Sequence, residues 1–157
     1  MLGLPVLGPV ASMDDHRVLA TQAIVATGNN AVREKLVQHL AATGFELATV
    51  VHPRAIVSRS AALGAGSAVM TGAIVGTEVR LGVGSIVNCG AVVDHDATVE
   101  DFGQLGVNAS MAGGTVLGRR ARMQTSSALG YGVKVPDGVT LAPGEASDNK
   151  TNRYKND

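Results

Sequence analysis

Fifteen aliphatic or methionine residues recur at every sixth position between Val57 and Leu141. Two residues before each lies a mostly small residue, such as Ala55, Ala91 or Ser127, and a glycine or another turn former often follows. An amphipathic helix repeats every 3.6 residues and a plain strand every two, so a period of six indicates short strands separated by tight turns. The pattern predicts a parallel β-helix, with the aliphatic side chains inside and the small ones near the corners.

Three hexads make one triangular coil of about 18 residues, so residues 55–144 predict about five coils. Residues 18 apart then stack in adjacent coils, and the two ends of the solenoid need caps because each coil pairs with its neighbours. The period alone does not give the handedness, and a solenoid with a purely structural role fits it equally well.

The composition agrees with a repeat and excludes several classes of protein. Aromatic residues make up only 3% of the chain and charged residues 17%, so the core must consist of small and aliphatic side chains. The net charge is zero, which favours neither nucleic acid nor an anionic membrane as a partner. A single cysteine, Cys89, allows no disulfide within the chain, and no apolar run is long enough to span a bilayer. We expect a cytoplasmic protein without a signal peptide, because residues 1–13 lack a basic start and contain two prolines.

Three regions follow from the pattern: a partial α/β, Rossmann-like segment over 1–52, a β-helix over 53–146 and a polar tail over 147–157. The tail is expected to be loose, with a basic contact from Lys150, Arg153 or Lys155.

Within the first region, apolar strands are expected over 23–27 and 45–51, with a helix between them. Asn30 is the expected helix cap and Gly44 the expected end of the helix. The face turned toward the rest of the protein is expected to carry Val32, Leu36 and Leu40.

The stretch VVDHDATVED (92–101) places His95 between Asp94 and Asp96. A neutral imidazole with a pKa near 6.5 can accept a proton at cellular pH. A carboxylate bonded to one ring nitrogen makes the other nitrogen a better base; Asp96 is the nearest candidate and Asp94 the alternative. An exposed histidine in an aspartate-rich turn explains the same residues equally well.

Stacking by 18 residues places Thr77 below His95 and Gly113 above it. The consecutive glycines Gly113 and Gly114 remove side chains above the imidazole and expose backbone amides. This arrangement predicts a groove beside the histidine for a narrow ligand.

Residues 86–118, IVNCGAVVDHDATVEDFGQLGVNASMAGGTVLG, resemble the left-handed β-helix acetyltransferases of the sialic-acid O-acetyltransferase and nucleotide-amino-sugar N-acetyltransferase family (NeuD/PglD type). The similarity extends back through FELATVVHPRAIVSRSAALGAG (45–66) and the preceding strand and helix. The spacing of Asn88, His95 and Asp96 is its most specific part.

This resemblance implies a homotrimer that binds acetyl-CoA between adjacent β-helices and acetylates an amine or hydroxyl of a sugar, often a nucleotide-linked one. His95 would be the general base and Asp96 its support, Asn88 would lie near the acceptor, and Gly113, with Gly114 beside it, would contact the pantetheine arm of the cofactor. Attack on the thioester would be direct, with no acyl-enzyme and no metal.

The sequence departs from this family at several places. Relatives often carry a second histidine nine residues after the base, where this chain has Gln104, which we expect to bind substrate by hydrogen bonding. The chain is expected to begin beyond the glycine-rich loop that helps relatives hold the nucleotide sugar, and its last coils are irregular around RRARMQTSSALGYG (119–132). These departures leave a catalytically degenerate trimeric scaffold as the alternative. A zinc enzyme is disfavoured, because such a site needs about three histidines and only His95 lies within the coils.

Overall fold

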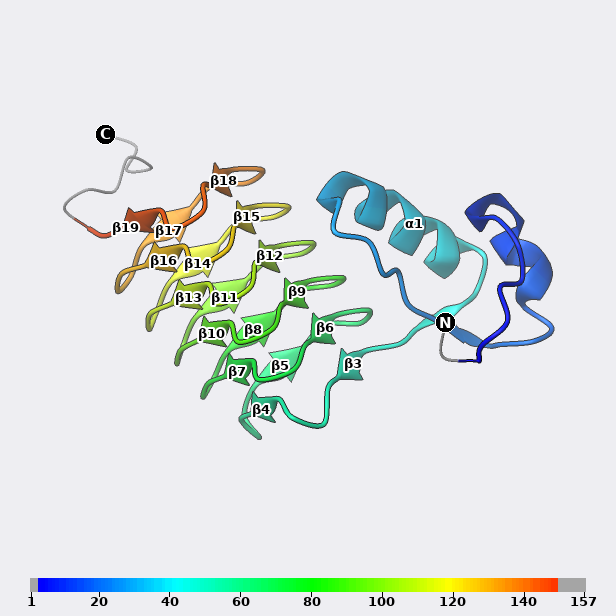
Figure 1. The fold of residues 1–157 in the computed structure, drawn as a ribbon, viewed down its shortest axis with the longest axis horizontal. Coiled ribbons are helices and arrows are strands. Elements are labelled where there is room, and N and C mark those ends of the chain that lie inside the picture. The colour runs from blue at the N-terminus through cyan, green and yellow to red at the C-terminus, as the bar shows by residue number, and fades with distance from the viewer. Residues whose placement is uncertain (1–2, 150–157) are drawn as a thin grey trace.

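The computed structural model describes residues 3–149, which form a small α/β segment beside a triangular β-helix (Figure 1). The N-terminal segment consists of the 3-10 helix η1 (Val10–His16), β1 (Gln22–Ala23), α1 (Asn30–Ala42) and β2 (Glu46–Leu47). The contacts expected for Lys150, Arg153 and Lys155 lie outside the described residues. No helix in the described range is long and apolar enough to cross a bilayer.

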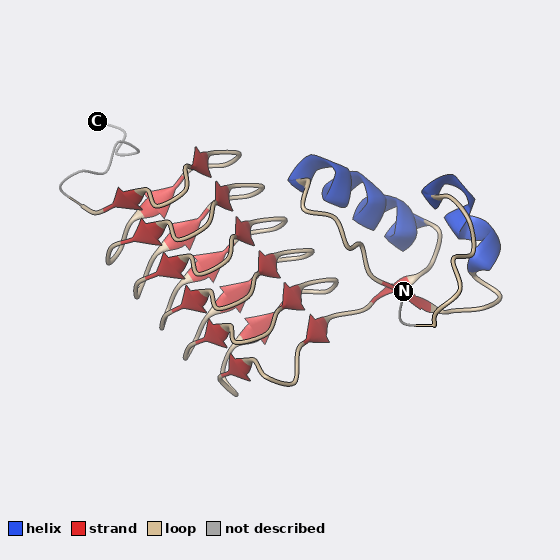
Figure 2. Ribbon diagram, viewed as in Figure 1, coloured by secondary structure: helices blue, strands red, loops and turns tan. Residues whose placement is uncertain are grey.

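Seventeen two-residue strands build the β-helix within the described part of the chain (Figure 2). Their bounds are β3 (Val50–Val51), β4 (Ile56–Val57), β5 (Ala62–Leu63), β6 (Ala68–Val69), β7 (Ile74–Val75), β8 (Arg80–Leu81), β9 (Ile86–Val87), β10 (Val92–Val93), β11 (Thr98–Val99), β12 (Gln104–Leu105), β13 (Ser110–Met111), β14 (Val116–Leu117), β15 (Arg122–Met123), β16 (Ala128–Leu129), β17 (Lys134–Val135), β18 (Thr140–Leu141) and β19 (Ala146–Ser147).

These strands form three parallel sheets, each named here after its first strand. The β3 sheet contains β3, β6, β9, β12, β15 and β18; the β4 sheet contains β4, β7, β10, β13, β16 and β19; the β5 sheet contains β5, β8, β11, β14 and β17. Val92 of β10 pairs with Ile74 of β7 and with Ser110 of β13, so one coil contains 18 residues, as the sequence predicts.

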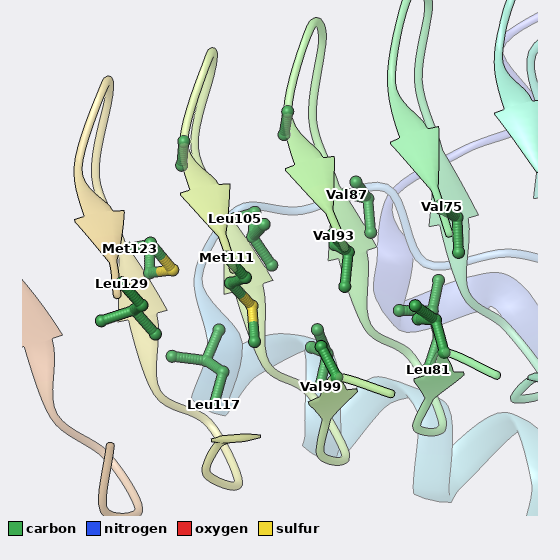
Figure 3. Close-up of a cluster of buried hydrophobic side chains, with 14 of the residues drawn as sticks. Val75, Leu81, Val87, Val93, Val99, Leu105, Met111, Leu117, Met123 and Leu129 are labelled. Carbon is green, nitrogen blue, oxygen red and sulfur yellow. The ribbon is translucent and has the colours of Figure 1, made fainter. Parts of the chain in front are cut away.

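The predicted inward residues form the core of the solenoid. Val93, Val99, Leu105 and Leu117 have no exposed surface, and Figure 3 shows such side chains directed into the interior from successive coils. Small corner residues such as Ala91 are equally buried. The stacked apolar side chains stabilise the solenoid because each coil buries its apolar residues against the coils on either side.

The turns share one backbone feature that the sequence shows only in part. Every sixth residue from Gly66 to Gly144 has a positive φ, and glycine occupies eight of these positions. Non-glycine residues occupy the other six, among them Asp96 with φ 58° and Ser126 with φ 58°. An L-residue in this left-handed conformation costs about 1–2 kcal/mol, which the hydrogen bonds between adjacent coils must offset.

The last coils are regular, although their sequence predicts irregularity. β15 pairs in register with β12 and β18 pairs in register with β15, so Arg122 lies opposite both Gln104 and Thr140. Ser126 adopts the same left-handed turn as the glycines, so loss of a turn glycine leaves the coil intact.

The strands outside the coils are shorter than expected. β1 includes only one residue of the strand predicted over 23–27, and the strand predicted over 45–51 splits in two. β2 pairs in parallel with β1, whereas β3 pairs with β6 and already belongs to the solenoid. The β-helix strands therefore run from Val50 to Ser147, slightly beyond the 53–146 expected.

Helix α1 begins one residue from its expected cap. Asn29 is the N-cap, and its Oδ1 accepts a hydrogen bond from the amide of Val32 at 3.1 Å. The expected cap, Asn30, is instead the first helical residue, and its Nδ2 donates to the carbonyl of Arg120 in the β-helix at 2.9 Å. Gly44 follows the helix with φ 85°, the conformation for which glycine is favoured there.

The inner face of α1 also differs from the prediction. Arg33, Val37 and Leu40 are buried, whereas Val32 is 44% exposed and Leu36 is only half-buried. Of the three residues expected on this face, only Leu40 is buried. The buried face is rotated from the predicted one because Arg33 contacts the coils together with Val37, whose Cγ2 would lie 3.7 Å from a Cβ on Gly84.

Arg33 ties the N-terminal segment to the β-helix, and Figure 1 shows α1 along the side of the coils that carries β9, β12 and β15. Its Nε donates to the carbonyl of Gly84 at 2.7 Å and its Nη2 to that of Phe102 at 2.8 Å. Its Nη1 donates to the carbonyl of Thr27 at 2.9 Å. A buried guanidinium is tolerated here because these carbonyls satisfy its donors.

Candidate active site

His95 lies in the turn between β10 and β11, at the corner where the β4 and β5 sheets meet. Its side chain is 53% exposed, and Nδ1 lies 2.8 Å from Oδ2 of Asp96. Asp94 holds the backbone of the turn, because its Oδ1 accepts from the amide of His95 at 2.8 Å. Asp96 is therefore the ring's partner, and Asp94 acts mainly on the main chain.

The bond to Asp96 sets the properties of the ring. An ionised carboxylate accepts from Nδ1–H, which leaves the lone pair of Nε2 free as a base. This hydrogen bond to Asp96 and, after it, the charge of Asp94 raise the pKa of His95 above its ordinary value of 6.5. Asp94 acts from a distance, since its Oδ2 lies 3.9 Å from Nε2.

The left-handed turn explains why two adjacent residues can form this pair. Asp96 occupies the positive-φ position, and its amide donates to the carbonyl of Thr77 in the preceding coil at 2.9 Å. The amide of Gly114 in the next coil donates to the carbonyl of His95 at 3.0 Å. Both peptides flanking the imidazole are thus anchored to neighbouring coils, in the order that the 18-residue spacing predicts.

The imidazole lies directly against Gly113. A Cβ added to Gly113 would lie 2.5 Å from Cε1 and 2.6 Å from Nε2 of His95, so the histidine can hold this position only because residue 113 has no side chain. A Cβ on Gly114 would meet nothing within 4 Å, so space is open beside the ring. The groove expected from the two glycines stays a prediction.

The amide of Gly113 has no acceptor among residues 3–149. In the coil below, the amide of His95 is satisfied by Asp94, but Ala112 precedes Gly113 and offers no side-chain acceptor. A free N–H can donate to a carbonyl oxygen, and a free imidazole nitrogen can accept a proton.

The other two predicted site residues lie elsewhere within the chain. Asn88 follows β9 at the corner between the β3 and β4 sheets, where its Oδ1 accepts from the amide of Cys89 at 2.9 Å. Gln104 lies on β12, is only 4% exposed, and its Oε1 is 3.5 Å from Nη1 of Arg33. The structure therefore brings together His95, Asp96 and the two glycines, and their contact with Asn88 or Gln104 stays a prediction.

The structure also contains a hollow that was not predicted from the sequence. It has a volume of about 470 Å³ and lies where the turn 28–31 faces Arg120 and Arg122. The run RRAR (119–122) is the signal that could have indicated it, because consecutive cations are unusual in coils otherwise made of small residues. Among the described residues, no group of three or more histidine, cysteine, aspartate and glutamate side chains could hold a metal ion.

Comparison with known proteins gives a consistent family. A histidine-to-asparagine variant of perosamine N-acetyltransferase from Caulobacter crescentus, in complex with CoA and GDP-perosamine, is 31% identical with a TM-score of 0.82. The match covers 95% of this chain and 74% of that one. This chain belongs to the left-handed β-helix sugar N-acetyltransferase family.

Two further members support the same family. The acetyltransferase domain of PglB from Neisseria gonorrhoeae FA1090, in complex with acetyl coenzyme A, is 33% identical with a TM-score of 0.88, over 95% of this chain and 75% of that one. UDP-N-acetylbacillosamine N-acetyltransferase from Bacillus subtilis (strain 168) is 37% identical over 65 residues, which are 40% of this chain and 30% of that protein. No family model matches the chain. The family resemblance and the left-handed β-helix predicted from residues 86–118 are confirmed.

Proposed function

We propose that the chain is an acetyl-CoA-dependent N-acetyltransferase whose acceptor is the amino group of a nucleotide-linked sugar. The observation that carries the proposal is the His95–Asp96 pair, whose imidazole lies against Gly113, a residue whose amide has no acceptor among residues 3–149. The named relatives support the amine as acceptor, since all three are N-acetyltransferases or carry an acetyltransferase domain.

In this mechanism, Nε2 of His95 removes a proton from the acceptor nitrogen as that nitrogen attacks the thioester carbonyl carbon. The new C–N bond forms, the C–S bond breaks, and the imidazolium returns the proton to the departing thiolate. Asp96 stabilises the imidazolium without itself taking the proton. The amide of Gly113 donates to the thioester oxygen as negative charge develops there.

The glycines of the site fit a thin ligand. The imidazole lies against Gly113, and a Cβ on Gly114 would meet nothing within 4 Å, so the open space at Gly114 suits the pantetheine arm of acetyl-CoA. No metal is required by this scheme, because the base and the carbonyl donor are both protein groups.

The proposal includes a homotrimer, with acetyl-CoA between adjacent subunits. Its support within the chain is the outer face of the β4 sheet, beside the corner that carries His95, where Ile56 is 66% exposed and Ile74 is 40% exposed. Asn88 and Gln104 lie away from His95 in one chain, so their proposed contact with the acceptor requires a neighbouring subunit. A cytoplasmic location remains an expectation.

The test is acetyl transfer from acetyl-CoA to GDP-perosamine and to UDP-N-acetylbacillosamine, followed as release of the CoA thiol. His95→Ala should lower kcat/KM by about 100-fold or more, the range expected for loss of a general base. Acetyl-CoA affinity, measured by calorimetry on the same variant, should change little. Full activity of His95→Ala would overturn the mechanism, and a trimer that binds no acetyl-CoA would favour the scaffold.

A further inference from the structure

Tyr131 is the first large side chain above His95 at the corner of the coils that carries the candidate active site. β16 pairs in register with β13, and β13 with β10, so residues 95, 113 and 131 occupy the same place in three successive coils. The amide of Gly114 donates to the carbonyl of His95 at 3.0 Å. The amide of Gly132 donates in the same way to the carbonyl of Gly113 at 3.1 Å, so the three turns are stacked by hydrogen bonds.

The two turns above His95 carry almost no other side chains. Residues 112–114 are Ala-Gly-Gly, and residues 130–132 are Gly-Tyr-Gly. The imidazole already occupies the level of Gly113, because a Cβ there would lie 2.6 Å from Nε2. Adjacent coils are about 4.8 Å apart, so the backbone of Tyr131 lies about one coil above the imidazole.

The column beside this one forms a bare track. Asp96 lies at the level of His95, and Gly114 and Gly132 follow it in the next two coils. A Cβ on Gly114 would meet nothing within 4 Å. A ligand in this open space therefore extends toward the next coil, away from the Asp96 side chain, and Tyr131 borders its path.

The ring of Tyr131 is free to contact a ligand. Among residues 3–149 the other two aromatic residues, Phe45 and Phe102, are buried, whereas Tyr131 is 67% exposed. Its backbone is nevertheless fixed, because Nδ2 of Asn149 donates to its carbonyl at 2.6 Å. Tyr131 thus presents a large apolar surface from a rigid turn and adds little to the core.

We propose that the ring of Tyr131 packs against the cysteamine part of the donor's arm, which is the two-carbon link from the sulfur to the first amide, and so holds the donor beside His95. This inference rests on the proposed function, which places the thioester oxygen at the amide of Gly113 and the arm at Gly114. The two-carbon link is about as long as one coil spacing of ~4.8 Å, so the first amide of the arm reaches the level of Tyr131. An aromatic side chain provides a large contact area with few torsions to immobilise. Tyr131 is therefore a positioning residue for the donor and takes no part in proton transfer.

The experiment is calorimetric titration of the full chain with acetyl-CoA. Tyr131→Ala should weaken binding about tenfold, the effect of losing one well-packed aromatic contact. Tyr131→Phe keeps the ring and should change the affinity less than about twofold. Val18→Ala is the matched control, since it removes a 90% exposed apolar side chain from the N-terminal segment and should leave the affinity unchanged.

Two further readouts separate this contact from a general loss of structure. In acetyl transfer, Tyr131→Ala should raise KM for acetyl-CoA about tenfold with kcat nearly unchanged, because the contact is made equally before and during the reaction. The chain contains only two tyrosines, so Tyr131→Phe identifies the NMR signals of the Tyr131 ring, which should shift when CoA binds.

Unchanged affinity in Tyr131→Ala, an equal loss in Tyr131→Phe, or ring signals that do not move in the presence of saturating CoA would overturn the inference. A wild type that binds acetyl-CoA, loses affinity on Tyr131→Ala and acetylates no acceptor would support this inference and refute the proposed function. A wild type that binds no acetyl-CoA would refute both.

Discussion

The contact between His95 and Gly113 gives the sharpest test of the site. In Gly113→Ala, the added Cβ would lie 2.5 Å from Cε1 and 2.6 Å from Nε2 of the imidazole. Ordinary carbon contacts are about 3.5 Å, so the ring must move by roughly 1 Å. The ring belongs to a half-exposed side chain, so it can move at little cost to the fold.

The backbone itself tolerates a side chain at this position. His95 and Tyr131 lie 18 residues before and after Gly113, at the same place in adjacent turns, and φ of Gly113 is not positive. The thermal midpoint of Gly113→Ala should therefore stay within a few degrees of the wild type. A displacement of about 1 Å at a reacting group can cost about 100-fold in rate, and this is the fall we expect in kcat/KM.

The assay is release of the CoA thiol with GDP-perosamine or UDP-N-acetylbacillosamine as acceptor, beside a thermal denaturation curve. The control is a double-mutant cycle with His95→Ala. If Gly113→Ala acts through the imidazole, the double variant should be no slower than His95→Ala alone. Additive losses would show that residue 113 acts on the cofactor directly, and full activity of Gly113→Ala would refute the reasoning from the contact.

Two further predictions rest on the hydrogen bonds of buried or paired groups. Asp96→Asn removes the largest cause of the raised pKa of His95. The acidic limb of the pH–kcat/KM profile should therefore move to lower pH, and the plateau value of kcat/KM should fall. An acidic limb that stays in place would contradict the role of Asp96. Arg33→Met leaves the carbonyls of Gly84 and Phe102 without hydrogen-bond donors. Each unsatisfied buried carbonyl costs about 1–3 kcal/mol, so the free energy of unfolding should fall by about 2–6 kcal/mol. Denaturant unfolding measures this loss, with the exposed Lys35→Met as control, and equal stability of both variants would show that Arg33 does not hold the segment in place.

The sequence predicts the fold well because the coils rest on local rules. A six-residue period places Val93 and Val99 inside without reference to any distant residue, and spacing by 18 then places Gly113 above His95. The pairing of His95 with Asp96 is also local. The last coils show a limit of the pattern, because residues 119–132 predicted irregular coils, whereas their strands pair in register and Ser126 adopts the left-handed turn.

The N-terminal segment depends on contacts that no local pattern shows. The helix and its ending at Gly44 were predicted, but the cap moved to Asn29 because Asn30 is used by the carbonyl of Arg120, 90 residues away. The buried face of α1 differs from the predicted one because Arg33 donates to carbonyls of two different coils.

The sequence by itself determined the coil, its register and the place of His95 between two aspartates, since each depends on residues at fixed spacing; the structure decided that Asp96 bonds the ring. Only the tertiary structure decided that Gln104 is buried beside Arg33, that the amide of Gly113 is free, and that Arg120 and Arg122 face the start of α1 across a hollow. Two of these features arise where the N-terminal segment meets the coils. The third arises where the coil of Gly113 lacks the side-chain acceptor that Asp94 provides in the coil below. They depend on contacts between residues that are far apart in the chain, and the spacing of residues in the sequence does not specify such contacts.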